Sequence, residues 1–292
     1  MREKRTVLLI LLLMFVVSVS LHSSCRQTGP ASPTEDAYAR MLRDGRIRVG
    51  YISYPPSFIK DPNTGAFSGI FDEVLQQVGN NLGVRIDYTE EVAWGTMIEA
   101  IRSGRVDLVC TGLWPTTARG KFADFTAPLY YSTVRAYTRA DNSKFDGNLA
   151  AINVPTVRIA AVDGEMSSII AKDDFPKAQV NSLPQNTEVA QVLLEVATNK
   201  SEVTFVEPAV AMEYIKNNPG KIKEVANVKP LRVFPNVMMV GKGEVRLKST
   251  MDVAIQELVS NGFVDKVIDK YEKYPNSFQR VATPYKETAA NK

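Results

Sequence analysis

Strand-like and helical segments alternate twice along this chain, and this alternation restricts the fold more than any other feature of the sequence. In the first series, strands are expected at Ile47–Ile52, Val84–Tyr88 and Val106–Cys110, with helices at Phe71–Leu82 and Met97–Arg102. The apolar residues of the longer helix recur at i, i+3, i+4, i+7 and i+11, which is one helical face. Helices placed between strands allow those strands to lie parallel, so the order predicts α/β layering around a largely parallel sheet.

A second series follows the polar break at Asp141-Asn142-Ser143. The patterns predict strands at Val157–Val162, Ala178–Leu183, Glu202–Val206 and Asn236–Val240, and helices over Gly164–Lys172, Val189–Val196 and Met251–Val259. A short helix over Thr34–Leu42 precedes both series. Two series of roughly 100 residues each match the usual size of a domain, so the chain is predicted to form two α/β lobes.

The first 25 residues differ in composition from the rest. Arg2, Lys4 and Arg5 precede an apolar run over Val7–Val19, and small residues follow up to Cys25. This order is typical of an export signal, which we predict for residues 1–25 and which would deliver the protein to the periplasm or the cell surface. The alternative is an uncleaved membrane anchor, because the apolar run is nearly long enough to span a bilayer.

Ser23-Ser24-Cys25 resembles the end of a bacterial lipoprotein signal, in which the cysteine becomes the lipidated N-terminus. His22 departs from that pattern, because an apolar or small residue is usual three places before the cysteine. The resemblance implies that Cys25 anchors the protein to a membrane through lipid. The segment RQTGPASP at 26–33 has the composition of a flexible tether.

Cysteine and histidine usage excludes several kinds of chemistry. With Cys25 lipidated, Cys110 is the one remaining thiol, so no internal disulfide is expected. Cys110 lies in an apolar strand pattern, which favours a buried structural side chain. The single histidine, His22, falls in the predicted signal, so the mature chain lacks the residues for Ser-His-Asp catalysis and for His-ligated zinc. No metal ion or cofactor is predicted.

The charge of the chain argues against a polyanionic partner. The formal net charge is +3, and removal of residues 1–25 takes away three cations and one anion, leaving 3 − 3 + 1 = +1. Lysine and arginine are scattered rather than gathered in a stripe, so nucleic-acid binding is not expected.

The segment from Gly104 to Tyr131 has the local chemistry of an anion site. Its apolar strand is followed by a predicted turn at Thr111-Gly112 and by a helix start at Thr116. Free backbone N–H groups and the positive end of a helix dipole meet at such a junction. Arg119 adds a planar, permanently charged guanidinium that suits a carboxylate.

Several motifs, taken together, resemble one family. They are RIRVGY at 46–51, YPPSF at 54–58, GAFSGIFDEV at 65–74, WGTMIEAIRSGRVD at 94–107, TGLWPTTAR at 111–119, DFTAP at 124–128 and NGFVDKVIDKY at 261–271. In this order they resemble the extracytoplasmic solute-binding proteins of amino-acid ABC transporters, solute-binding protein family 3, which have the periplasmic binding protein type II fold. The resemblance extends over nearly all of residues 46–272.

The family fold implies two α/β lobes with a ligand cleft between them, joined by two hinge crossings and closing around the ligand by hinge bending. The first lobe is expected over 46–136 with 235–274, and the second over 137–234. The crossings should fall near Val134–Thr138 and Leu231–Phe234. Residues 26–45 are expected to form the tether and short helix, and residues 275–292 a polar tail that frays.

By the resemblance, Arg119 binds the α-carboxylate of the ligand, Gly112 offers backbone groups, and Thr116 donates its hydroxyl to the same carboxylate. The structural alternatives are a solvated Arg119 or one paired with Asp124, a plain tight turn at Gly112, and Thr116 as a helix cap. Glu207 stands where the family usually has an aspartate that receives the α-ammonium group. Its alternative is a carboxylate that interacts only with a helix N-terminus.

Aromatic residues are expected to cover the ligand side chain. Trp94 corresponds to a family aromatic at that place, and Tyr51 and Tyr54 lie on the loop that usually supplies another. Flat aromatic faces suit apolar or cationic groups, and core packing is the alternative for these rings.

Two segments depart from the family pattern. Trp114 replaces the usual serine or threonine, so position 114 offers the ligand no hydroxyl. Asp163-Gly164-Glu165-Met166 replaces a turn rich in glycine and threonine. The backbone N–H of Met166 is expected to contact the carboxylate, while Asp163 or Glu165 either favours a cationic ligand side chain or faces water.

The resemblance implies an extracytoplasmic substrate-binding protein that captures an amino acid or a closely related small carboxylate for an ABC importer. Its partners would be that small molecule, a membrane permease and, through the lipid on Cys25, the membrane. It is expected to act as a monomer and without catalysis. Two alternatives stay open: an enzyme of the cyclohexadienyl dehydratase type with Glu207 as general acid, and a ligand sensor for a membrane partner.

Overall fold

The computed structural model describes residues 35–281 of the 292-residue chain. The predicted export signal, Cys25 and residues 26–34 of the tether lie outside the described residues, as do residues 282–292 of the tail. Residues 37–281 belong to one compact unit. No helix within the described residues is both long and apolar enough to cross a membrane.

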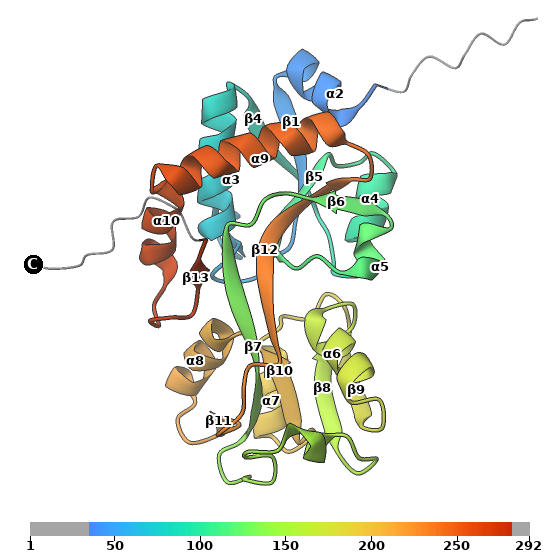
Figure 1. Cartoon of the computed structure of the whole chain (residues 1–292), viewed down its shortest axis with the longest axis vertical. Helices are drawn as coiled ribbons and strands as arrows, with labels where there is room; N and C mark the ends of the chain where they lie inside the picture. The colour runs from blue at the N-terminus through green and yellow to red at the C-terminus, as the bar shows by residue number, and fades with distance from the viewer. Residues whose placement is uncertain (1–34, 282–292) are drawn as a thin grey trace, which may run out of the picture. The chain divides into compact units, whose positions relative to one another are not determined.

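The first lobe is the part of this unit built around three parallel strands (Figure 1). Strand β1 (Arg46–Tyr51) pairs in parallel with β4 (Arg85–Glu91) on one side and with β5 (Leu108–Leu113) on the other. The remaining elements of this lobe are α2 (Ala37–Asp44), β2 (Ile59–Lys60), β3 (Phe67–Ser68), α3 (Ile70–Leu82), α4 (Met97–Arg102), α5 (Thr117–Gly120), β6 (Ala123–Phe125), α9 (Val245–Ser260), α10 (Phe263–Tyr271) and β13 (Gln279–Arg280).

The second lobe is built in the same way. Strand β8 (Arg158–Val162) pairs in parallel with β9 (Gln179–Leu183) and with β10 (Val203–Val206). Its other elements are the 3-10 helix η1 (Leu149–Ile152), α6 (Met166–Asp174), α7 (Gln191–Ala197), α8 (Pro208–Asn217) and β11 (Ile222–Glu224). The predicted alternation of strands and helices around largely parallel sheets is thus confirmed in both lobes.

Two long antiparallel strands join the lobes (Figure 1). Strand β7 (Tyr130–Arg139) pairs with β12 (Arg232–Gly241) from Tyr130↔Asn236 to Val134↔Arg232. Strand β12 then continues beside β5, and β7 continues beside β10. The strand order β4-β1-β5-β12-β7-β10-β8-β9 therefore runs through both lobes as one sheet.

The structure corrects the predicted turn at Thr111-Gly112. Strand β5 does not end at Cys110 but continues to Leu113, because Leu113 pairs with Val237 of β12. Gly112 is therefore a strand residue. The sequence patterns predicted no strand at β7, although the crossing implied near Val134–Thr138 lies within it, whereas α4 begins and ends at the predicted residues.

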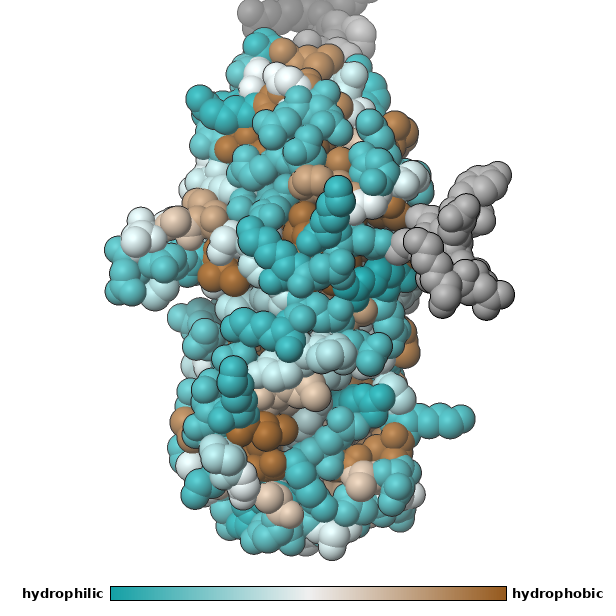
Figure 2. Space-filling model, turned by 90° about the vertical axis from the view of Figure 1, so that its left-hand side faces the viewer, coloured by the Kyte–Doolittle hydropathy of each residue, from teal (hydrophilic) through white to brown (hydrophobic). Residues whose placement is uncertain are grey.

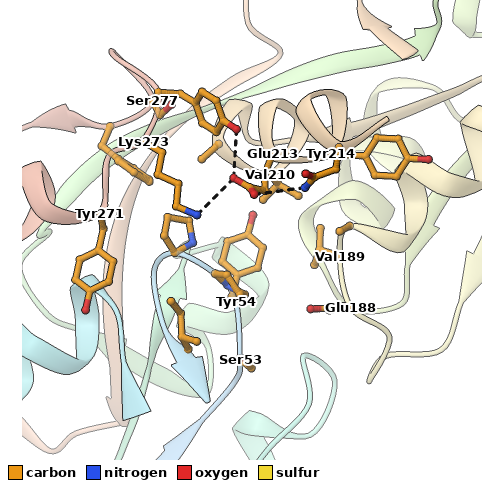
Figure 3. A pocket seen from close by; sticks show the side chains of 18 of the residues that line it. Ser53, Tyr54, Glu188, Val189, Val210, Glu213, Tyr214, Tyr271, Lys273 and Ser277 are labelled. Atoms are coloured by element: carbon orange, nitrogen blue, oxygen red, sulfur yellow. Dashed lines mark hydrogen bonds and ion pairs between the residues drawn. The ribbon is translucent and has the colours of Figure 1, made fainter. Parts of the chain in front are cut away.

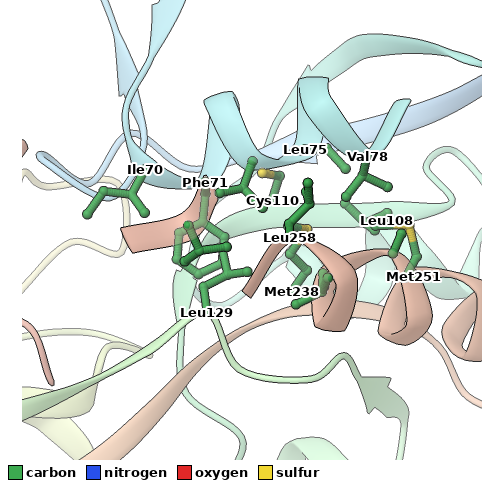
Figure 4. Packing of buried hydrophobic residues seen from close by; sticks show 14 of the residues in the cluster. Ile70, Phe71, Leu75, Val78, Leu108, Cys110, Leu129, Met238, Met251 and Leu258 are labelled. Atoms are coloured by element: carbon green, nitrogen blue, oxygen red, sulfur yellow. The ribbon is translucent and has the colours of Figure 1, made fainter. Parts of the chain in front are cut away.

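The core of the first lobe lies between α3 and α9 (Figure 4). Phe71, Leu75 and Val78 of α3 point toward Met251 and Leu258 of α9, and none of these side chains is more than 1% exposed. The apolar face predicted from the helical spacing is therefore the face that packs. Cys110 belongs to the same cluster, and its thiol is free and fully buried. The prediction of a buried cysteine is therefore confirmed.

Part of the C-terminal segment that was expected to fray is packed. Gln279–Arg280 of β13 pairs with Tyr130–Tyr131 of β7, and the Phe278 ring lies 4.9 Å from the Tyr130 ring, centroid to centroid. Phe278 is 3% exposed. The polar composition of this segment predicted that it frays, but burial of the Phe278 ring holds part of it in place.

Candidate functional site

Arg119 is held by the short helix α5 and by two backbone carbonyls. Thr116 caps the helix, since its Oγ1 accepts a hydrogen bond from the backbone N–H of Arg119 at 3.2 Å. Nη1 of Arg119 donates to the carbonyl of Trp114 at 2.9 Å, and Nη2 donates to the carbonyl of Gly164 at 3.0 Å. The second bond reaches into the other lobe. Asp124, the alternative partner of this arginine, pairs with Lys242 instead.

Burial controls the electrostatics of Arg119. The residue is 7% exposed, and this desolvation lowers the pKa of its guanidinium, while Glu165 acts in the opposite direction. Arginine remains charged under such conditions because its ordinary pKa is above 12. Two of its five N–H donors bond to the carbonyls of Trp114 and Gly164, which leaves three for a ligand.

Gly112 is required by close packing in β5. A Cβ at this position would lie 2.7 Å from Oγ and 2.9 Å from Cβ of Ser57, and 3.1 Å from Oδ1 of Asn236. Those separations are too short for any side chain without movement of the neighbours. The close approach, rather than a turn, accounts for glycine here.

A chain of hydrogen bonds links Trp114 to Glu207 across the two crossing strands. Nε1 of Trp114 donates to Oδ1 of Asn236 at 3.1 Å. Nδ2 of Asn236 donates to Oγ of Ser132 at 2.7 Å, and Ser132 Oγ in turn donates to Oε1 of Glu207. The indole of Trp114 also stacks on Phe234 of β12, with centroids 4.9 Å apart and an interplanar angle of 13°.

Glu207 is a buried acid at the junction of β10 and α8. It is 1% exposed, and its side chain makes no capping hydrogen bond to the helix. Oε2 accepts a hydrogen bond from the hydroxyl of Tyr54 at 3.1 Å, so the first lobe contributes to its surroundings. Desolvation, with a smaller effect of Glu165, raises the pKa of Glu207 to about 7, although Ser132 and Tyr54 act against the rise. Its proton occupancy therefore changes near neutral pH.

The two acids that precede α6 have different surroundings. Asp163 is exposed and accepts a hydrogen bond from Ser182. Glu165 is 5% exposed and caps the helix by accepting from the backbone N–H of Ser167 at 2.6 Å. Desolvation raises the pKa of Glu165. Met166, the first residue of α6, is 3% exposed.

The aromatic residues divide into two groups. Trp94 and Tyr54 form a T-shaped pair with ring centroids 5.8 Å apart. Tyr51 instead lies in an aromatic cluster with Phe58, Phe67 and Tyr88, at centroid distances of 5.6, 4.9 and 5.9 Å. Tyr51 is therefore packed in the core of the first lobe and does not line the cavity at Arg119.

Most of the predicted site residues surround one small cavity. It is lined by Tyr54, Trp94, Gly112, Leu113, Trp114, Arg119, Glu165 and Met166. Glu207 adjoins it through Tyr54, and Thr116 supports Arg119 from outside. The cavity volume is about 10 Å³, which is room for about one water molecule.

The lobes are close together at this cavity. Gly164 has φ +77°, and a Cβ there would lie 3.1 Å from the backbone nitrogen of Gly95 in the first lobe. The cavity therefore has no room for a molecule larger than water unless the lobes move apart.

Sequence reasoning missed Ser132, Asn236 and the carbonyl of Gly164 as parts of the site. A polar residue inside an apolar strand pattern was the one available signal, and it applies to Asn236 but not to Ser132. No group of three or more His, Cys, Asp or Glu residues among residues 35–281 is arranged to hold a metal ion. The site thus offers one cation, two acids and aromatic faces, which suit a small molecule carrying both charges.

Comparisons with known proteins agree on the family. The model of the bacterial extracellular solute-binding proteins, family 3, matches residues 47–274. The chain is 22% identical to the L-cystine-binding protein TcyA of Bacillus subtilis over 273 residues, covering 90% of this chain and 96% of that protein.

Two solved structures have the same fold. An ancestral amino acid-binding protein described as a precursor of cyclohexadienyl dehydratase aligns with a TM-score of 0.71 at 24% identity, covering 82% of this chain and 100% of the other. An amino acid ABC transporter substrate-binding protein from Streptococcus pneumoniae, bound to L-arginine, aligns with a TM-score of 0.69 at 21% identity, covering 85% and 100%.

Proposed function

Because the chain belongs to the bacterial extracellular solute-binding proteins, family 3, we propose that it captures an amino acid between its lobes and passes it to an ABC importer. One observation carries the proposal: buried Arg119 of the first lobe lines the cavity, and buried Glu207 of the second lobe accepts a hydrogen bond from Tyr54, which lines the same cavity. The names of the similar proteins, which bind cystine or arginine, support an amino acid as the ligand.

In this proposal Arg119 binds the α-carboxylate. Its three remaining N–H donors permit a two-point contact without loss of the bonds to Trp114 and Gly164. Glu207 receives the α-ammonium group and must be ionised to do so. Since its pKa is about 7 before the ammonium group arrives, binding below that pH releases a proton.

Glu165 extends the proposal to the ligand side chain. Once Arg119 and Glu207 have paired with the two backbone charges of an amino acid, Glu165 is the buried acid left over at the cavity. A cationic side chain would compensate it, and the ring faces of Tyr54 and Trp94 attract cations as well. We therefore propose a cationic amino acid such as arginine.

Hinge bending supplies the space that the ligand needs. We propose that residues 46–136 with 235–274 move as one body and residues 137–234 as the other, about the paired segments of β7 and β12. The hydrogen-bonded chain from Trp114 to Glu207 lies on those segments, so the bend and the site are adjacent. The protein is proposed to act as a monomer, anchored through lipid on Cys25.

Calorimetry with the twenty common amino acids tests the proposal. We expect binding of arginine in the micromolar range or tighter, and a loss of at least about 100-fold in Arg119→Met, because two charge-assisted hydrogen bonds disappear. Arg85→Met is the matched control, since Arg85 has a side chain that is 69% exposed. The proposal fails if no amino acid gives heat, or if both variants bind as the unaltered protein does.

Citrulline, a neutral analogue of arginine, tests the role of Glu165. The unaltered protein should prefer arginine by about tenfold or more, and Glu165→Gln should lose most of that preference while retaining binding. An unchanged preference in the variant would remove Glu165 from the ligand site.

Catalysis is the second candidate function. The observation in its favour is a buried acid, Glu207, whose pKa of about 7 suits a general acid. We propose that no turnover occurs. Incubation with prephenate and with arogenate, followed by chromatography, distinguishes the two functions, since an enzyme would release product and a binding protein would return the compound unchanged.

A further inference from the structure

The hydrogen-bonded chain from Trp114 to Glu207 brings together four buried side chains from different parts of the fold. Trp114 directly follows β5, Asn236 lies in β12, Ser132 lies in β7, and Glu207 stands between β10 and α8. Hydrophilic side chains dominate the surface on the side of α8 and α10 (Figure 2), whereas this chain lies in the interior, and none of its four members is more than 5% exposed. Polar groups buried in this way depend on one another for hydrogen bonds.

The cavities of the protein offer these side chains little water. A cavity of about 630 Å³ lies beside α8, and Tyr54 lines both this cavity and the one at Arg119 (Figure 3). No member of the chain from Trp114 to Glu207 lines the larger cavity. Trp114 alone of the four lines the cavity at Arg119, which has room for about one water molecule. Water is therefore a poor substitute for the partners within the chain.

The indole of Trp114 fixes the direction of the hydrogen bonds. An indole nitrogen donates one hydrogen bond and accepts none, so the atom of Asn236 that faces it must be the carbonyl oxygen. The amide nitrogen of Asn236 then faces Ser132 and donates to its Oγ at 2.7 Å. Ser132 accepts on this side, and its single proton is left to be donated to Oε1 of Glu207.

The opposite orientation of the Asn236 amide would take this proton away from Glu207. A carbonyl oxygen turned toward Ser132 would compete with Glu207 for the one proton of the hydroxyl. Nε1 of Trp114 would then face the amide nitrogen, which is also a donor, and a buried N–H would lose its acceptor. Trp114 therefore excludes the orientation in which Glu207 loses a hydrogen-bond donor.

We propose that Trp114 is a positioning residue: its N–H orients Asn236 so that Ser132 donates its proton to Glu207, which keeps that carboxyl group ready for the ammonium group of the ligand. This role rests on the proposed capture of an amino acid and deepens it. Trp114 acts on Glu207 through two intermediate side chains and does not bond to it directly.

The titratable groups around Glu207 come from three parts of the chain. Tyr54 donates to its Oε2, Tyr130 of β7 interacts with it electrostatically, and Glu165 lies before α6. Burial raises the pKa of Glu207 to about 7, with a smaller contribution from Glu165, and of the two hydroxyls that oppose the rise Ser132 has the larger effect. Loss of the Ser132 proton should therefore raise the pKa of Glu207 further.

NMR spectroscopy of glutamate labelled at its side-chain carboxyl carbon tests this role without any ligand. Glu207→Gln identifies the signal of Glu207, which should titrate at about pH 7 in the unaltered protein. Trp114→Phe keeps an aromatic ring beside Phe234 but lacks the N–H. It should raise the pKa of Glu207 by about one unit, the effect of one hydrogen bond to a charged group.

Phe234→Leu is the matched control. It removes the ring that stacks on Trp114 and leaves the indole N–H in place, so the pKa of Glu207 should stay within about 0.3 units of its value in the unaltered protein. An equal rise in Phe234→Leu and Trp114→Phe would assign the effect to packing and overturn the proposal.

A double variant distinguishes the direction of the hydrogen bonds from packing. Asn236→Leu, added to Trp114→Phe, removes the carbonyl that competes for the Ser132 proton. The pKa of Glu207 should then return to within about half a unit of its value in the unaltered protein. A pKa that stays raised or rises further in the double variant contradicts the proposed orientation of Asn236.

The unaltered protein provides a test that needs no substitution at Trp114, should Trp114→Phe fail to show a cooperative melting transition. The chain holds two tryptophans, so Trp94→Phe assigns their indole N–H resonances. The Trp114 resonance should titrate together with Glu207, because linked hydrogen bonds polarise one another, and should stay constant in Glu207→Gln. An indole resonance that does not respond to Glu207 overturns the proposal.

Arginine binding is measured separately by calorimetry. Because Glu207 must be ionised to receive the ammonium group, Trp114→Phe should weaken arginine binding about tenfold at pH 6 and less than about twofold at pH 8.5. If Glu207 titrates alike in Trp114→Phe and the unaltered protein while arginine binds, the role of Trp114 is refuted and the proposed function stands. If the titration shifts as expected but no amino acid binds, Trp114 does orient the chain and the proposed function fails.

Discussion

Ionisation of Glu207 should make the stability of this protein fall as the pH rises toward neutrality. Burial raises the pKa of Glu207 from 4.5 to about 7, so between these values the folded chain holds a proton that the unfolded chain has released. Because the folded state binds more protons there, raising the pH favours unfolding. The effect is about 1.4 kcal/mol per pH unit, or about 3 kcal/mol over the full interval.

Urea denaturation between pH 4.5 and 8, with Glu207→Gln as the comparison, measures this effect. Glutamine keeps the size and the acceptor oxygen but does not ionise. The difference in free energy of unfolding between the two proteins should therefore change by about 3 kcal/mol across the interval and level off above pH 7. Glu165, whose pKa is also raised, is present in both proteins, so it contributes to the difference only through its coupling to Glu207. A difference that does not vary with pH would refute the reasoning about Glu207.

Two further substitutions test the packing of the fold, and a third tests the ligand site. Gly112→Ala should lower stability by about 1–3 kcal/mol in urea denaturation, because its Cβ would lie 2.7 Å from Oγ of Ser57, whereas Gly120→Ala, with no atom within 4 Å, should not. Phe278→Ala should cost about 3 kcal/mol in the same assay, and a neutral result would mean that the C-terminal packing is dispensable. Tyr51→Phe should leave the arginine affinity measured by calorimetry within twofold, since Tyr51 lies in the aromatic cluster of the first lobe. A large loss of affinity would show that the Tyr51 hydroxyl takes part in binding.

Local patterns were sufficient for much of the fold. Apolar spacing predicted α3 because the side of a helix that packs is set by residues a few places apart. It failed for β7, which pairs with β12, β10, β11 and β13 in turn. The burial of β7 comes from partners far away in the chain, so its own pattern does not show where it begins or ends.

The candidate site, like the fold, was predicted only in part from the sequence. The sequence by itself determined that an arginine follows a strand near a helix start and that an acid follows another strand, because both are properties of short segments. The motif resemblance added which residues to examine, but it treated Tyr51 and Tyr54 alike, and it left Asp163 and Glu165 undecided.

Tertiary structure alone shows that the surroundings of those residues differ. Tyr54 meets Glu207 across 153 positions of sequence, and Ser132 meets it across 75, so no local pattern contains either contact. Tyr51 lies in the aromatic cluster and Glu165 lines the cavity at Arg119 because of what packs around each in three dimensions. The cavity at Arg119 is likewise lined by residues from both lobes, from Tyr54 to Met166, so no single segment defines it.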